Sequence, residues 1–118
     1  METKSLSEST ICCFGDSTTW GDNGCGAGGN DISWTSHLGA LLGGAVVENF
    51  GIKGSRIAIK ADRTDSFVER LDGIDDAADI YIVFGGVNDF SRNVPLGELG
   101  STDVHEFYGA LDYLIRTI

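Results

Sequence analysis

The chain has 118 residues, which is enough for one compact domain and too few for a two-domain enzyme. Its 8 Lys and Arg stand against 18 Asp and Glu, and the resulting net charge of −10 repels nucleic-acid phosphates and anionic lipid headgroups. The composition therefore argues against a nucleic-acid-binding or membrane-surface protein. The 17 glycines and single proline predict several loops in which backbone conformation matters.

The ends and the cysteines indicate the kind of protein to expect. No apolar run approaches the roughly 18 residues of a membrane span, and METKSLSEST lacks the apolar core of a secretory signal. We expect a soluble, cytoplasmic chain with a flexible tail over residues 1–9 and one domain over residues 10–118. Cys12, Cys13 and Cys25 are expected to be reduced thiols. We expect no cofactor and no metal, because no spaced Cys-x-x-Cys pair occurs and the two histidines lie far apart.

The first half of the chain predicts two strands and a helix. A β-prone run over residues 10–14 predicts a buried strand, and the glycine-rich residues 21–30 predict a surface loop beside its end. Apolar residues at helical spacing predict a helix over residues 33–42, with Ser33 as its N-cap and a Gly-Gly pair as its stop. Residues 45–50 predict a second strand.

The second half continues this alternation. Residues 65–71 predict a helix, and the almost continuous β-formers at 79–84 predict a parallel strand covered on both faces. A last helix is expected to begin near Asp103, which has capping-box spacing to Glu106. Its apolar stripe comprises Val104, Phe107, Tyr108, Leu111, Leu114, Ile115 and Ile118. Strands alternating with helices predict an α/β fold with a parallel sheet and right-handed crossovers.

Each predicted strand ends in a polar turn that contains glycine. The turns are GDSTT at 15–19, NFGIKGS at 49–55 and GGVND at 85–89. Because ligands bind outside the carboxyl ends of parallel strands, we expect the three turns to meet at one edge of the sheet. A serine there can present its hydroxyl, while a glycine N–H and an asparagine amide can stabilise an oxyanion. Each turn alone is more typical of ordinary loop chemistry, so their joint order carries the prediction.

These segments resemble the motifs of the SGNH, or GDSL-type, hydrolases. The matching stretches are ICCFGDST at 11–18, NFGIKG at 49–54 and FGGVNDF at 84–90, although position 18 is Thr rather than the Leu of the family name. The resemblance implies a three-layer α/β/α sandwich with the first strand between the second and third. It also implies Ser17 as the nucleophile, with its own N–H, the Gly54 N–H and the Asn88 side chain as oxyanion hole. Asp16, expected to fix the turn around Ser17, and Asp89 are supporting residues.

One family motif is absent. Members carry a late Asp-x-x-His, whose His is the general base, and this sequence contains no such motif. The resemblance therefore implies an N-terminal part of the fold with about three strands, incomplete at its C-terminus. His37 and His105 both fall in predicted helices, where a packed or solvated histidine is more typical than a base. Serine hydrolases lose roughly 10⁴- to 10⁶-fold in rate without a triad member, so the isolated chain is expected to be weak or inactive.

Two functions from different classes follow from the resemblance. The first is an esterase or acylhydrolase that cleaves small acyl or acetyl esters through an acyl-serine intermediate, with its base lost or supplied from outside the chain. The second is a non-catalytic remnant or interaction module that retains the fold. The acidic run over residues 72–79 leaves calcium binding as a third alternative, although the EF-hand pattern is absent.

The expected partner is a small-molecule ester, with neither nucleic acid nor membrane. The missing distal strands imply an exposed edge on the third strand and an incompletely covered last helix. Self-association through that strand edge or that helix is therefore a further expectation.

Overall fold

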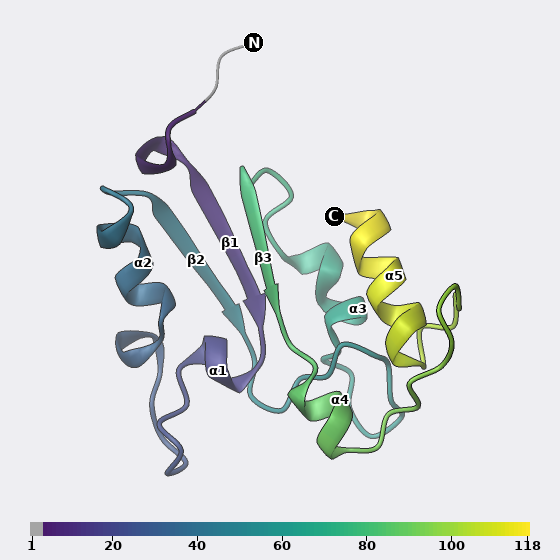
Figure 1. The fold of residues 1–118 in the computed structure, drawn as a ribbon. Helices are drawn as coiled ribbons and strands as arrows, with labels where there is room; N and C mark the ends of the chain where they lie inside the picture. The colour runs from purple at the N-terminus through teal and green to yellow at the C-terminus, as the bar shows by residue number, and fades with distance from the viewer. Residues whose placement is uncertain (1–3) are drawn as a thin grey trace. The chain divides into compact units, whose positions relative to one another are not determined.

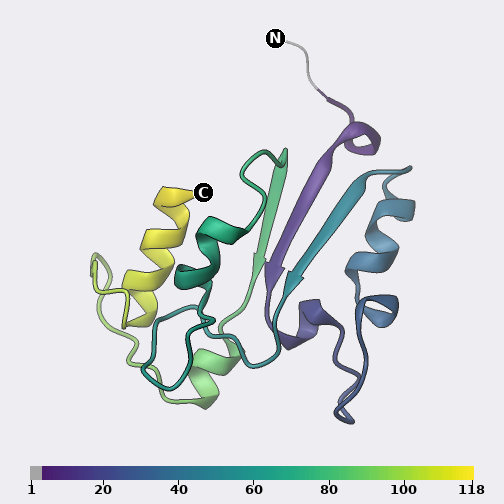
Figure 2. The same ribbon diagram turned by 180° about the vertical axis from the view of Figure 1, so that it is seen from behind.

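The computed structural model describes residues 4–118, which form two compact units (Figures 1 and 2). The sheet unit contains the chain up to Lys53 together with Asp75–Phe84, and the helical unit contains Gly54–Ile74 and Gly85–Ile118. Of the tail expected over residues 1–9, residues 1–3 lie outside the described residues. A single 3-10 turn, η1, forms at Leu6–Glu8.

The sheet unit has three parallel strands in the order β2-β1-β3 (Figure 1). Their bounds are Thr10–Gly15 for β1, Val46–Gly51 for β2 and Ile80–Phe84 for β3. These strands confirm the α/β fold, the parallel sheet and the central position of the first strand. The same unit contains α1 (Ser17–Trp20), η2 (Asn30–Ile32) and α2 (Thr35–Leu41). The three-layer arrangement stays a prediction.

Helix α2 covers one face of the sheet because its apolar side meets the core of the unit. Ile11, Cys13 and Ala45 are buried there. Six partly buried side chains pack against them: Trp34, Leu38, Leu42, Val47, Ile80 and Ile82. Apolar spacing in the sequence therefore located this helix correctly.

Ser33, the residue predicted to cap α2, caps its first turn from one position before the assigned N-cap. Trp34 occupies the cap position and makes no side-chain cap bond. The buried Ser33 hydroxyl instead donates to the Thr19 carbonyl at 2.6 Å and accepts from the Thr35 N–H at 3.2 Å. Ser33 thus joins the start of α2 to α1. The local sequence does not show this contact, because Ser33 and Thr19 lie in different segments.

The cysteines agree with the expected free thiols. Cys12 and Cys13 are buried in β1, Cys25 is exposed, and none forms a disulfide. Burial raises the pKa of each strand thiol to about 11. The two strand cysteines therefore act as small apolar core residues and not as thiolates.

The third strand is less covered than predicted. Val83 and Phe84 are 38% and 49% exposed, so the expectation of a strand buried on both faces is wrong at its carboxyl end. Continuous β-formers indicate a strand, but they do not show how much of it each neighbouring layer reaches.

A carboxyl pair joins β2 to the segment before β3. The hydrogen bond between Glu48 and Asp75 raises the pKa of Glu48, and burial raises it further, whereas the same bond lowers the pKa of Asp75. The Tyr81 hydroxyl donates to the Asp75 carbonyl at 2.6 Å and fixes this segment. The pair is therefore most favourable with Glu48 protonated and Asp75 ionised.

We expect Glu48→Gln to raise the melting temperature near pH 8 and to change the melting temperature little at about pH 4. A carboxyl whose pKa is raised on folding contributes stability below its unfolded pKa and loses that contribution as the pH rises through its folded value. The amide keeps a neutral donor toward Asp75 at every pH. Melting curves of both proteins across this range test the expectation, and a pH-independent difference would contradict it.

The helical unit contains three α-helices and one 3-10 turn. These are α3 (Phe67–Arg70), η3 (Leu71–Gly73), α4 (Val87–Ser91) and α5 (Phe107–Thr117). A capping box starts α3, since Ser66 Oγ accepts from the Glu69 N–H while the Glu69 carboxylate accepts from the Ser66 N–H. Helices α3 and α5 lie side by side (Figure 2).

The last helix begins later than predicted. Its N-cap is Glu106, and Asp103 instead accepts the His105 N–H in a tight turn. A competing local turn thus displaced the expected capping box. The predicted stripe is correct at Leu114, which is buried, and wrong at Ile115, which is 70% exposed.

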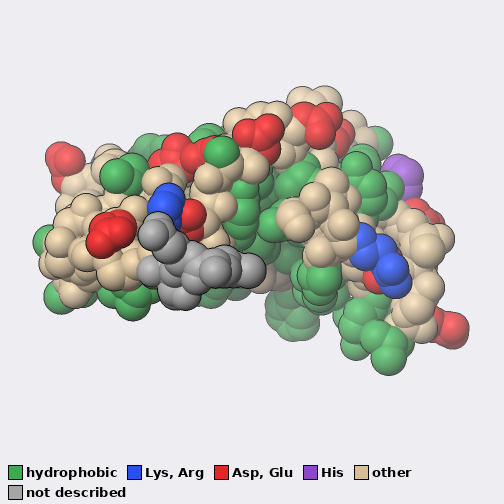
Figure 3. Space-filling model, turned by 90° about the horizontal axis from the view of Figure 1, so that it is seen from above, with side chains coloured by type: hydrophobic (Ala, Val, Ile, Leu, Met, Phe, Trp, Pro, Cys, Tyr) green, Lys and Arg blue, Asp and Glu red, His purple; other side chains and the backbone are tan. Residues whose placement is uncertain are grey.

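The surface reflects the acidic composition. Asp and Glu side chains recur across the face in Figure 3, where few Lys or Arg appear. Within residues 4–118, no helix is long and apolar enough to cross a bilayer. The same residues contain no group of three His, Cys, Asp or Glu side chains that could hold a metal ion.

Candidate active site

The three strands end together at one edge of the sheet. Gly15 lies in register with Gly51 on one side and with Phe84 on the other. The segments that follow β1, β2 and β3 therefore leave the sheet at the edge where parallel α/β proteins bind ligands (Figure 1).

Ser17 is the first residue of α1, directly after β1. The buried Asp16 is the N-cap, and its side chain accepts the Thr18 N–H at 3.0 Å. Gly21 ends this four-residue helix in a left-handed conformation, and its N–H donates to the Ser17 carbonyl at 3.0 Å. Both ends of the turn are thus fixed, and the half-buried Ser17 is held at the sheet edge.

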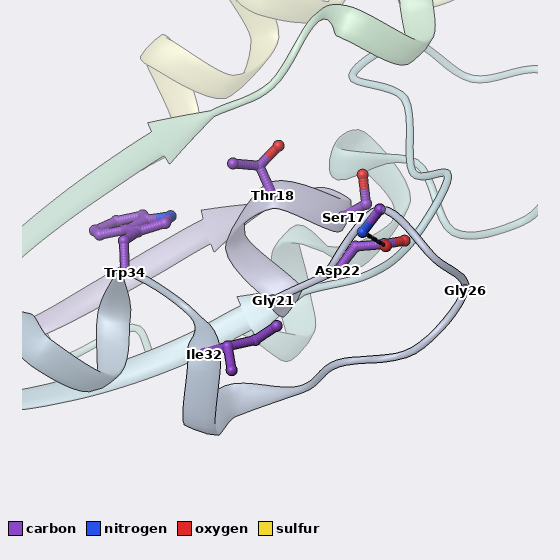
Figure 4. A pocket seen from close by; sticks show the side chains of 8 residues that line it. Ser17, Thr18, Gly21, Asp22, Gly26, Ile32 and Trp34 are labelled. Carbon is purple, nitrogen blue, oxygen red and sulfur yellow. Dashed lines mark hydrogen bonds between the residues drawn. The ribbon is translucent and has the colours of Figure 1, made fainter.

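A pocket of about 590 Å³ opens beside Ser17 (Figure 4). The glycine-rich loop forms much of its wall, together with Asp22, Ile32 and Trp34. Figure 4 shows Trp34 and Ser17 on opposite sides, with Asp22 next to Ser17. Its volume lies in the range of small-molecule sites.

The glycine-rich loop is tied to α1 by backbone hydrogen bonds. The Gly29 N–H donates to the Gly21 carbonyl at 2.9 Å, and Asp22 forms an isolated antiparallel bridge with Gly28. A Cβ at Gly28 would lie 2.0 Å from the Gly21 oxygen, so only glycine permits this approach. The predicted loop thus lines the pocket as a closed hairpin.

Asp22 brings a negative charge to the pocket, and Lys53 balances part of it. The Lys53 ammonium lies 3.5 Å from the Asp22 carboxylate and 4.7 Å from the centre of the Trp20 ring. The Gly24 N–H also donates to Asp22 at 2.7 Å. The carboxylate is therefore held in place, and the pocket disfavours an anionic ligand.

The other two predicted oxyanion donors, Gly54 and Asn88, belong to the helical unit. Asn88 lies on α4, and its amide donates to the Ser55 carbonyl at 2.9 Å. Because an asparagine amide has two N–H groups, this bond orients the side chain and leaves a second donor for a ligand. The bond also ties Asn88 to the residue that follows Gly54.

Asp89 makes the stronger connection between these two segments. Its side chain is buried, and its two carboxylate oxygens accept the Ile57 N–H at 2.8 Å and the Ala58 N–H at 3.0 Å. Together with the Asn88 bond, these contacts fix the segment after Gly54 against α4. The helical unit therefore holds both predicted oxyanion donors in one hydrogen-bonded assembly.

Gly54 has a positive φ of 79°, and Arg63 packs against it. A Cβ at Gly54 would lie 2.3 Å from an Arg63 guanidinium nitrogen. Arg63 Nε donates to Asp65 at 2.9 Å, and this guanidinium lowers the pKa of the Asp65 carboxyl. Ser55 Oγ in turn donates to the Asp65 carbonyl at 2.6 Å. The turn at Gly54 is thus enclosed by a polar network.

Residues 13–118 match the GDSL-like lipase/acylhydrolase family. The chain belongs to this family. The match includes Ser17, Gly54 and Asn88 and confirms the resemblance seen in the three motifs.

Solved structures share the fold of this GDSL-like chain. One crystal structure is 96% identical over 97% of the chain, with a TM-score of 0.95. A protein from Lactobacillus plantarum is 35% identical over 94% of the chain, with a TM-score of 0.76. A carbohydrate acetylesterase family member from Sinorhizobium meliloti is 25% identical over 92%, with a TM-score of 0.71.

The chain spans about half the length of these three proteins, since the matches cover 52%, 50% and 52% of them. No curated protein matches the GDSL-like chain significantly.

Among residues 4–118 of the GDSL-like chain, no hydrogen bond or ion pair is described between either histidine and Ser17. His37 is exposed on α2 and does not line the pocket beside Ser17. His105 belongs to the helical unit, where its Nδ1 lies 3.0 Å from an Asp103 carboxylate oxygen on the exposed surface.

Sequence reasoning missed several contributors to this GDSL-like site. It did not predict α1 or α4, the short helices that carry Ser17 and Asn88. The Asp-Ser-Thr order at 16–18, typical of an N-cap, was the available signal for α1. Nothing in the local pattern indicated the Asp89 contacts or the packing of Arg63 on Gly54, because both join distant segments.

Proposed function

We propose that this chain carries the nucleophile and oxyanion donors of a serine ester hydrolase that acts through an acyl-serine intermediate. The observation that carries the proposal is Ser17, held at the start of α1 beside a pocket in a chain of the GDSL-like lipase/acylhydrolase family.

The proposed reaction has two halves. Ser17 Oγ attacks the ester carbonyl, and the N–H groups of Ser17 and Gly54 and the Asn88 amide stabilise the oxyanion. The base passes the Ser17 proton to the leaving alcohol. Water then attacks the acyl-serine, which releases the carboxylic acid and restores the Ser17 hydroxyl. The general base is proposed to come from outside the residues described here, since a serine hydroxyl is almost fully protonated at neutral pH.

We propose small acyl or acetyl esters without a negative charge as the substrate class. The Asp22 carboxylate at the pocket and the net charge of −10 both disfavour anionic substrates. The name of the Sinorhizobium meliloti relative, a carbohydrate acetylesterase family member, supports a neutral acetylated compound.

Intact-mass analysis after fluorophosphonate treatment tests this function. We expect one phosphonyl adduct on the wild-type chain, formed slowly in the absence of a base, and none on Ser17→Ala. Ser36→Ala is the matched control, because Ser36 is an exposed serine on α2 that does not line the pocket. It should be labelled like the wild type.

A wild-type chain that stays unlabelled during prolonged treatment, while remaining folded, would contradict the catalytic proposal. That result would favour the second function, a non-catalytic binding module that retains the fold.

A further inference from the structure

The sheet unit contains a second pocket, which the proposed mechanism does not use. It lies along β2 and has a volume of about 400 Å³, within the range of small-molecule sites. The residues that line it are Trp20, Asn30, Val47, Asn49 and Gly51, and none of them lines the pocket beside Ser17. We call it the β2 pocket.

Strand β2 gives the β2 pocket one apolar end and one polar end. Alternate residues of a strand point to the same face, so Val47, Asn49 and Gly51 share one side of β2. Val47 packs against the core that α2 covers. Gly51 admits the backbone of Trp20 to the end of the strand, since a Cβ there would lie 2.1 Å from the Trp20 nitrogen. The pocket therefore runs from Val47 past the Asn49 amide to Trp20.

Hydrogen bonds hold the two amide side chains of the β2 pocket in place. Asn49 Nδ2 donates to Asn30 Oδ1 at 2.9 Å, and Thr35 Oγ1 donates to the same oxygen at 3.1 Å. Asn49 Oδ1 accepts the Gly51 N–H at 2.9 Å. Both amide oxygens are thus used within the protein, whereas no hydrogen bond within residues 4–118 is described for the Asn30 NH2 group. This group offers two oriented N–H donors to a ligand.

The backbone of β2 adds an acceptor at the same place. The N–H groups of Val46 and Ile52 donate to the carbonyls of Ser9 and Gly15 at 3.1 and 3.2 Å, and so face β1. Backbone groups of successive strand residues point in opposite directions, so Asn49 directs its carbonyl away from β1. Among the described strands, β2 has β1 as its one neighbour. The Asn49 carbonyl can therefore accept a hydrogen bond from a ligand in the pocket.

The chemistry of the lining favours an uncharged ligand that has hydroxyl groups and an apolar face. The half-buried Trp20 supplies an aromatic wall, and the Lys53 ammonium restrains its indole from 4.7 Å. No acidic or basic side chain of the described chain lines the pocket, and the net charge of −10 disfavours an anion. A sugar ring meets these requirements, because its C–H groups can pack on the indole while its hydroxyls bond to amide and backbone groups.

We propose that the β2 pocket binds one pyranose ring of an uncharged saccharide. The Asn30 amide donates to hydroxyl oxygens of the sugar, the Asn49 carbonyl accepts from a hydroxyl, and Trp20 packs on the C–H face. This binding goes beyond the reaction proposed at Ser17 and does not depend on it, since the two pockets share no lining residue.

Nitrogen–proton NMR titration of the full chain with methyl glycosides tests the proposal. The probes are the neutral methyl β-pyranosides of glucose, galactose, mannose and xylose. We expect at least one to shift the Trp20 indole and Gly51 amide signals saturably, with a dissociation constant of about 1 to 10 mM. Sorbitol has similar hydroxyls but no ring, and it should bind at least threefold more weakly.

Two variants locate the bound sugar. Trp20→Leu should weaken binding at least tenfold by removing the aromatic wall. Asn30→Ala should weaken it about threefold or more, and it covers the case that the Trp20 variant does not fold, because Asn30 is exposed. Asp31→Ala is the matched control, since Asp31 is exposed on the same 3-10 turn and does not line the pocket. It should bind as the wild type does.

The proposal is overturned if no glycoside binds saturably, or if sorbitol binds as tightly as the best glycoside. Equal weakening by Asn30→Ala and Asp31→Ala would overturn it too, because it would indicate an effect outside the pocket. Weakening by Ile32→Ala but not by Asn30→Ala would place the sugar in the pocket beside Ser17, which Ile32 lines. None of these results changes the fluorophosphonate labelling of Ser17, so the two proposals fail separately.

Discussion

Asp89→Ala is expected to lower the free energy of unfolding by about 3–5 kcal/mol. The substitution removes the carboxylate that accepts the Ile57 and Ala58 N–H groups and leaves both donors buried. An unsatisfied buried donor costs about 1–3 kcal/mol, and the carboxylate bonds themselves are charge-assisted. Urea denaturation of the variant and the wild type measures the difference.

Two further variants make the Asp89 prediction specific. Asp89→Asn keeps one acceptor oxygen, so its loss should be smaller, about 2 kcal/mol. Asp112→Ala removes an acid from an exposed pair with Arg116 and should cost less than about 1 kcal/mol. A loss after Asp89→Ala no larger than that after Asp112→Ala would show that the two bonds contribute little.

Gly51→Ala is expected to cost about 2–3 kcal/mol and to slow fluorophosphonate labelling of Ser17 at least tenfold. A Cβ at Gly51 would lie 2.1 Å from the Trp20 backbone nitrogen and 2.7 Å from the Thr19 carbonyl carbon. Both atoms are main chain, so a side-chain rotation cannot relieve the overlap. Helix α1 must move away from β2, and Ser17 moves with it.

The control for Gly51→Ala is Gly73→Ala. Gly73 has no neighbouring atom within 4 Å of the Cβ position, so the change should be within about 0.5 kcal/mol and labelling should be unaffected. Denaturation curves and labelling rates of the two variants settle the comparison. If Gly51→Ala labels at the wild-type rate, α1 does not depend on its close approach to the end of β2.

The strands could be read from the sequence because their signal is local. Runs of β-formers at 10–14, 45–50 and 79–84 and the turn glycines after them placed all three strands within a residue or two. The order β2-β1-β3 came from the motif resemblance, since pairing partners are not encoded in any single segment. Helices α1 and α4 were missed because four or five residues cannot display a helical period.

In the candidate site, too, residues within local motifs could be predicted, whereas contacts between distant segments could not. Ser17, Gly54 and Asn88 were named from short motifs, and Asp16 from its place in one of them. The contacts that fix these residues were not predictable. They include the ion pair between Lys53 and Asp22 and the hydrogen bond from the Ile57 N–H to the Asp89 carboxylate. Such contacts depend on tertiary proximity, and nothing in the spacing of the residues indicates them. The burial of Leu114 beside an exposed Ile115 shows the same dependence in α5.

The central position of β1 has a consequence for how the chain is made. Thr10 pairs with Val46, whereas Ile11 also pairs with Ile80, so the second pairing closes a chain segment roughly twice as long. During synthesis, β1 and β2 are both complete before β3 has been made. Until β3 arrives, one side of β1 presents unpaired backbone, and the core thiols of Cys12 and Cys13 lack part of their cover. The nascent chain therefore passes through an interval in which this side of β1 and the two buried thiols are more open to aggregation and oxidation than they are in the complete sheet.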